Sequence, residues 1–199
     1  MFAFILQAVG LFIVTNIDDI IVLALFFARG AGRPGTTTRI IAGQYLGFGA
    51  ILITSIVIAI GANSFLPESI IPYFGLIPLA LGLRAAWKIW RGEAEDDDDE
   101  ELITSKPISV TSVAAVTFAN GGDNVGVYVP VFVTVGTSGI VAYSGIFLLL
   151  IAALVLAARF VATRKYIAVI LERWEHVLFP IVLIGLGIFI LVEGGAFGI

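Results

Sequence analysis

Two short stretches of this chain place carboxylates and amides inside long apolar runs. They are Thr15-Asn16-Ile17-Asp18-Asp19 and Asn120-Gly121-Gly122-Asp123-Asn124. An aspartate near the middle of a bilayer costs roughly 2.5–3.5 kcal/mol on insertion scales, so these side chains must face a polar interior. Carboxylate, amide and hydroxyl oxygens suit divalent cations that accept hard ligands. We therefore predict a metal site made by Asn16, Asp18, Asp19, Asn120, Asp123 and Asn124, with Thr15, Gln44 and Tyr45 as supporting candidates.

The composition predicts an integral membrane protein. Of the 199 residues 59% are hydrophobic and only 13% are charged, with a mean hydropathy of +1.07. A soluble domain is typically about a quarter charged. We expect a multi-pass protein of the cell membrane, with the lipid bilayer as its partner. The chain has no cysteine, which excludes disulfides and thiolate metal sites.

Six apolar segments predict an all-α protein with six transmembrane helices, since about 20 residues span a bilayer. Residues 93–106 carry most of the negative charge and predict an acidic cytoplasmic linker. Arg159 to Glu175 reads as a charged loop. The first ten residues lack the basic region of a cleavable signal peptide. The segments are residues 2–28, 39–62, 70–90, 107–135, 140–158 and 176–192.

The basic residues predict the orientation. All 11 lie beside loops one, three and five, which places those loops in the cytoplasm and both termini outside. They are Arg29, Arg33, Arg39, Arg84, Lys88, Arg91, Lys106, Arg159, Arg164, Lys165 and Arg173.

The two halves of the chain resemble each other. A shift of 104 residues superposes Asn16 on Asn120 and Asp19 on Asp123. Three helices in each half force the second copy to enter the membrane from the opposite side. We therefore predict two inverted three-helix repeats, residues 1–92 and 107–199, in an N-out/C-out arrangement, with the site between them near the midplane.

The acidic residues also predict that metal transport is coupled to proton movement. Three carboxylates in one cavity cannot all stay ionised without a cation, so an empty site should hold a proton shared between Asp18, Asp19 and Asp123. The leading hypothesis is a secondary active exporter of divalent cations in exchange for protons. An exporter of amino acids or other small organic solutes is the alternative. An intramembrane enzyme is disfavoured, because no nucleophile or catalytic metal triad accompanies the aspartates.

The two motifs resemble those of the cadmium resistance transporter family, within the lysine exporter superfamily. The resemblance rests on residues 15–19, the apolar run ending Leu25-Phe26-Phe27, and the stretch from Asn120 to Tyr128. It implies export of Cd²⁺, with Zn²⁺ or Mn²⁺ as further substrates. We expect no resident cofactor and no nucleic-acid partner, and a homo-oligomer stays open.

Overall fold

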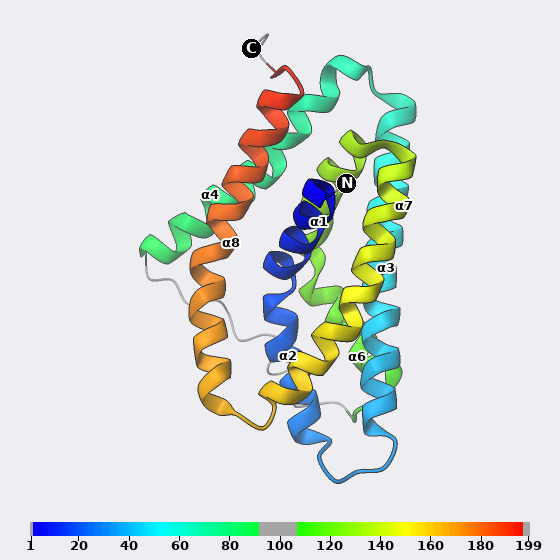
Figure 1. The fold of residues 1–199 in the computed structure, drawn as a ribbon, viewed down its shortest axis with the longest axis vertical. Coiled ribbons are helices and arrows are strands. Elements are labelled where there is room, and N and C mark those ends of the chain that lie inside the picture. Colours follow the sequence, from blue (N-terminus) through cyan, green and yellow to red (C-terminus); the bar gives the residue numbers. More distant parts are fainter. Residues whose placement is uncertain (1, 92–106, 197–199) are drawn as a thin grey trace.

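The described part of the chain, residues 2–91 and 107–196 of a computed structural model, contains helices and no strands (Figure 1). The predicted acidic linker lies outside it. The elements in chain order are α1 (Phe2–Thr15), α2 (Ile17–Arg29), α3 (Thr36–Phe65), the 3₁₀ helix η1 (Glu68–Gly75), α4 (Leu76–Arg91), α6 (Val110–Asn120), α7 (Gly122–Val161) and α8 (Lys165–Glu193).

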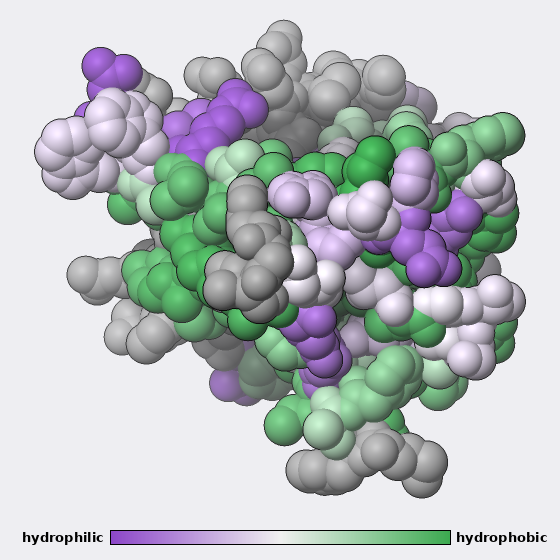
Figure 2. All heavy atoms as spheres, turned by 90° about the horizontal axis from the view of Figure 1, so that it is seen from above, coloured by the Kyte–Doolittle hydropathy of each residue, from purple (hydrophilic) through white to green (hydrophobic). Residues whose placement is uncertain are grey.

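Several of these helices could cross a membrane. Among the described residues, Thr36–Phe65, Glu68–Arg91 and Gly122–Val161 are long and apolar enough to cross a bilayer. Helices α1 and α2 add a fourth span if the bent pair counts as one. Large apolar side chains such as Ile53, Leu149 and Leu156 are exposed. Figure 2 looks along the long axis of the molecule and shows hydrophobic and hydrophilic side chains side by side on this end.

Helix α7 is two helices joined at one residue. A straight helix of its 40 residues would be about 60 Å long. Gly136 instead has φ 67° and ψ 179°, a geometry that favours glycine, and the chain turns back there (Figure 1). Within the turn predicted over Gly136 to Gly139, only Gly136 therefore departs from helical geometry.

One predicted loop was wrong, and the third predicted segment begins with a different kind of helix. The charged loop expected over Arg159 to Glu175 is largely helical, because α7 continues to Val161 and α8 already begins at Lys165. Lys, Arg and Glu are good helix formers, so charge did not mark a loop here. The third segment begins as a 3₁₀ helix that contains Pro72. Proline has no backbone N–H, so it cannot donate the hydrogen bond of a regular α-helix.

Close helix contacts hold the bundle together. Helices α4 and η1 pack against α8, where a Cβ on Gly187 would lie 2.6 Å from the carbonyl oxygen of Gly75. Helix α3 packs against α6, where a Cβ on Gly47 would lie 2.7 Å from the carbonyl oxygen of Ala114. In α8 a Cβ on Gly187 would also lie 2.6 Å from the backbone nitrogen of Leu79, whereas a Cβ on Gly185 would meet no atom within 4 Å.

Candidate functional site

The first polar motif breaks a helix. Helices α1 and α2 meet at Asn16 with a bend of 53°, and Asn16 itself has φ −130° and ψ 19°. The side chains of the motif bond back to backbone carbonyls one turn earlier in α1: Asn16 Nδ2 donates to Phe12 O at 2.8 Å, and Thr15 Oγ1 donates to Leu11 O at 2.9 Å. The break places both aspartates in the first turn of α2.

The second polar motif also breaks a helix. Helix α6 ends at Asn120, Gly121 has φ −84° and ψ 20°, and α7 begins at Gly122. A Cβ on Gly121 would collide with Ile51 of α3. Helix α6 therefore ends directly before the two glycines, and the tip of the Ile51 side chain lies over Gly121.

The two breaks meet through Asn120. Its Nδ2 donates to Asp18 Oδ2 at 2.8 Å and to Asp19 Oδ1 at 2.9 Å, so one amide bridges two carboxylates. Asp19 is buried, with 1% of its surface exposed, while Asp18 and Asn120 are half-buried. A cation between the carboxylates would occupy much the same place as this amide nitrogen.

Gln44 completes the arrangement from α3. Its Nε2 donates to Asp19 Oδ2 at 2.8 Å, and its Oε1 accepts from Thr117 Oγ1 at 2.6 Å. Both side chains are buried. The sequence prediction included Gln44 but missed Thr117. Thr117 lies three residues before Asn120 and hence on the same face of α6, a spacing that could have revealed it.

A second, neutral group of polar side chains lies beside the carboxylates. The hydroxyl of Tyr128, on α7, lies 2.8 Å from Thr15 Oγ1 and accepts from Asn16 Nδ2 at 2.9 Å. Asn124 lies one turn before Tyr128 on the same helix face. In the described part of the chain, the buried Oδ1 atoms of Asn16 and Asn124 accept no hydrogen bond. Two amide oxygens are therefore available as ligands.

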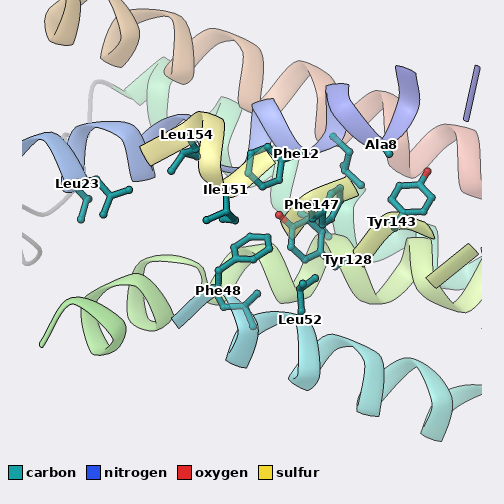
Figure 3. Packing of buried hydrophobic residues seen from close by; sticks show 14 of the residues in the cluster. Ala8, Phe12, Leu23, Phe48, Leu52, Tyr128, Tyr143, Phe147, Ile151 and Leu154 are labelled. Carbon is teal, nitrogen blue, oxygen red and sulfur yellow. The ribbon is translucent and has the colours of Figure 1, made fainter. Parts of the chain in front are cut away.

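Aromatic rings surround the neutral group. Phe12, Phe48, Phe147 and Tyr128 come from α1, α3 and both parts of α7, and they gather around one point (Figure 3). Ring centroids are 5.7 Å apart for Phe12 and Phe48 and 5.0 Å apart for Tyr128 and Phe147. All four side chains are buried. The hydroxyl of Tyr128 connects this apolar cluster to the side chains of the polar motif.

A family comparison decides the identity. The family model described as cadmium resistance transporter matches residues 12–199, which include both broken helices and all residues of the predicted site. The chain belongs to the cadmium resistance transporter family. Neither a curated protein nor a solved structure matches the chain. Membership of this transporter family, together with the apolar helices, makes the chain a membrane protein.

In this member of the cadmium resistance transporter family, two predicted site residues have surroundings that differ from those of the buried residues just described. Asp123 is exposed in the isolated chain. The described residues contain no group of three or more acidic, histidine or cysteine side chains placed to hold one metal ion, so the three aspartates do not share one site in this conformation. Tyr45 donates to the backbone oxygen of Leu148 at 3.2 Å and thereby ties α3 to α7.

The described polar groups suit hard cations better than cadmium. Cadmium is soft and prefers thiolate, yet the chain has no cysteine. The carboxylates and amides found together here would select poorly among divalent ions. Cadmium as a substrate therefore rests on the family and not on the ligand chemistry of this site.

A separate cavity lies elsewhere in the bundle. Its volume is about 620 Å³, and it is lined by parts of α1, η1, α7 and α8. The polar side chains in its wall include Gln7, Glu68, Thr134 and Glu193. No residue of the predicted metal site lines it, which makes its carboxylates useful controls.

Proposed function

We propose that this protein is a secondary active exporter of divalent metal cations that works in exchange for protons in the cell membrane. The observation that carries the proposal is the bridge from Asn120 to Asp18 and Asp19. It brings two adjacent carboxylates and amides from two broken helices to one place. Broken helices with polar groups at the break are the usual construction of ion sites in secondary transporters.

The proposed architecture has six spans in two inverted repeats. The spans are α1 with α2, α3, η1 with α4, α6 with the first part of α7, the rest of α7, and α8. The α2–α3 and α7–α8 connections lie at one end of the molecule in Figure 1, whereas the start of α1 and the α3–η1 connection lie at the other. This arrangement supports the orientation inferred from the basic residues, with both termini outside.

The proposed coupling uses the carboxylates. Asp18 and Asp19 are adjacent, and Asp19 is almost fully buried, so two negative charges without a cation would repel each other strongly. The cation-free site therefore carries a proton shared by the aspartates, and Asp123 joins them in another conformation. A metal ion must displace that proton, because its ligands have to be deprotonated. Protons that enter through the same site then drive the metal outward.

Titration calorimetry tests the proposal. Cd²⁺, Zn²⁺ and Mn²⁺ are titrated into purified protein in buffers of different ionisation enthalpy, between about pH 6 and 8. We expect the observed heat to vary with the buffer, because binding releases protons, and the affinity to weaken as the pH falls. The variant Glu68→Gln, which removes a carboxylate from the separate cavity, should behave like the wild type.

Two outcomes would contradict the proposal. A heat that is the same in every buffer, with an affinity that is constant across the pH range, would exclude proton exchange. If no divalent metal binds but an amino acid raises the thermal unfolding midpoint, the protein is instead an exporter of organic solutes.

A further inference from the structure

The amides of Asn120 and Gln44 face the carboxylates with their N–H groups, which are the wrong atoms for metal binding. Asn120 and Gln44 both point N–H groups at Asp19, with donor–acceptor distances of 2.9 and 2.8 Å. The opposite orientation would place amide oxygens against carboxylate oxygens, so the hydrogen bonds fix this assignment. A dication seated between the carboxylates would face these N–H groups, which repel it.

A half-turn of each amide removes the conflict. The terminal torsion of glutamine and asparagine is broad and roughly two-fold, so exchanging the nitrogen and oxygen barely changes the shape of the side chain. The rotated amide presents an oxygen, which is a good ligand for a hard divalent cation. For a buried amide, however, the group on its far side must accept both orientations.

Thr117 is suited to both orientations of Gln44. At present its hydroxyl donates to Gln44 Oε1 at 2.6 Å. After the rotation Gln44 Nε2 would face the same hydroxyl, which can accept a hydrogen bond as well as donate one. A buried threonine can then give its own proton to a backbone carbonyl one turn earlier in its helix. Gly47 helps to keep Thr117 this near to α3, because a Cβ there would lie 2.7 Å from Thr117 Cβ.

We propose that Gln44 rotates its amide to become a ligand when a divalent cation binds, and that Thr117 is the positioning residue that supports both orientations. The inference rests on the proposed function, and it names two residues that decide how the site accepts its cation. Without a metal, the amide N–H groups compensate the carboxylates. With a metal, the same amide of Gln44 adds an oxygen to the coordination shell.

Affinity measurements on three variants test the role of Thr117. We expect Thr117→Val to weaken Cd²⁺ or Mn²⁺ binding about tenfold or more, since valine matches the shape but has no hydroxyl for the rotated amide. Thr117→Ser should restore binding to within about threefold, because it restores the hydroxyl. Ser55→Ala is the matched control: Ser55 is a fully buried hydroxyl of α3 that bonds to Ile51 O of its own helix. An unchanged affinity in Thr117→Val would overturn the role of Thr117.

Infrared spectroscopy tests the rotation directly, and this test remains possible even if the Thr117→Val variant does not fold. The chain has two glutamines, Gln7 and Gln44, so ¹³C-labelled glutamine in a Gln7→Asn background reports on Gln44 alone. We expect the labelled carbonyl band to shift when metal is added to the otherwise wild-type protein, and the shift to shrink in Thr117→Val. Metal binding without a band shift would overturn this inference and leave the proposed function intact. Absence of metal binding in the wild type would contradict the proposed function itself.

Discussion

The two helix breaks carry the same Asn-x-x-Asp pattern but differ in their surroundings. At the first break Asn16 and Asp19 are both 1% exposed, and α3 supplies Gln44 to Asp19. At the second break Asn120 is half-buried and Asp123 is exposed. Asn120 donates its hydrogen bonds to the two aspartates of the first motif.

This difference shows that a motif repeated in the sequence is not used symmetrically in one conformation. One aspartate of the repeated pair is buried, and its counterpart is exposed. A protein built from two inverted repeats can exchange these roles between conformations, since each repeat has the same ligand types. Under the proposed architecture the structure represents one of the two arrangements, and substitutions can show which acid acts at which stage.

The largest expected effect separates the two aspartates. Asp19→Asn should weaken metal binding at least about a hundredfold, because it removes the buried charge that Asn120 and Gln44 compensate. Asp123→Asn should change equilibrium binding less than about threefold yet stop export. Calorimetry measures the first quantity, and metal uptake into inverted vesicles measures the second. Equal losses of binding in both variants would show that the aspartates share one site.

The next effect concerns the contact that places Gln44 and Thr117 together. Gly47→Ala should destabilise the protein by about 1–3 kcal/mol, because the added methyl would overlap with the backbone of α6. It should also weaken metal binding by moving Thr117 away from Gln44. Thermal unfolding in detergent and calorimetry provide the two readouts. Gly49→Ala is the control on the same helix, since a Cβ there meets no atom within 4 Å. Identical behaviour of the two variants would contradict the packing argument.

The smallest effect concerns the neutral side of the first break. Tyr128→Phe removes a hydroxyl that bonds to Thr15 and Asn16, and it should lower stability by about 1–2 kcal/mol. Tyr143→Phe is the matched control, because Tyr143 is equally buried but its hydroxyl has no hydrogen-bond partner in the described residues. Thermal unfolding should separate the two variants. A larger loss in Tyr143→Phe than in Tyr128→Phe would contradict the assignment of this hydrogen bond.

The sequence predicted the helical class, and it located the two polar motifs at which the structure breaks a helix, because both features have a local signature. Charge inside an apolar run and adjacent glycines can be recognised without knowing the fold. The partnership of Thr117 with Gln44 could not be predicted with the same certainty, since it joins residues 73 positions apart. The contact of Tyr128 with the first motif was equally hard to predict. Its aromatic ring is typical of a core residue, and only its hydroxyl group bonds to Thr15 and Asn16. The start of α8 was wrongly predicted as a loop because its residues are charged. Charged residues such as Lys, Arg and Glu are also good helix formers, and this helix propensity decided the structure.

The bridging amide of Asn120 also affects how quickly a cation can leave. When a dication departs from bare carboxylates in a poorly solvated site, their charges remain uncompensated and dissociation is slow. Here Asn120 and Gln44 can return their N–H groups to Asp18 and Asp19, and the start of α2 adds roughly half a positive elementary charge. In the proposed exporter these groups would stabilise the site after release and so shorten the residence time of the ion. An exporter needs such a compromise, because turnover depends on release as much as on capture.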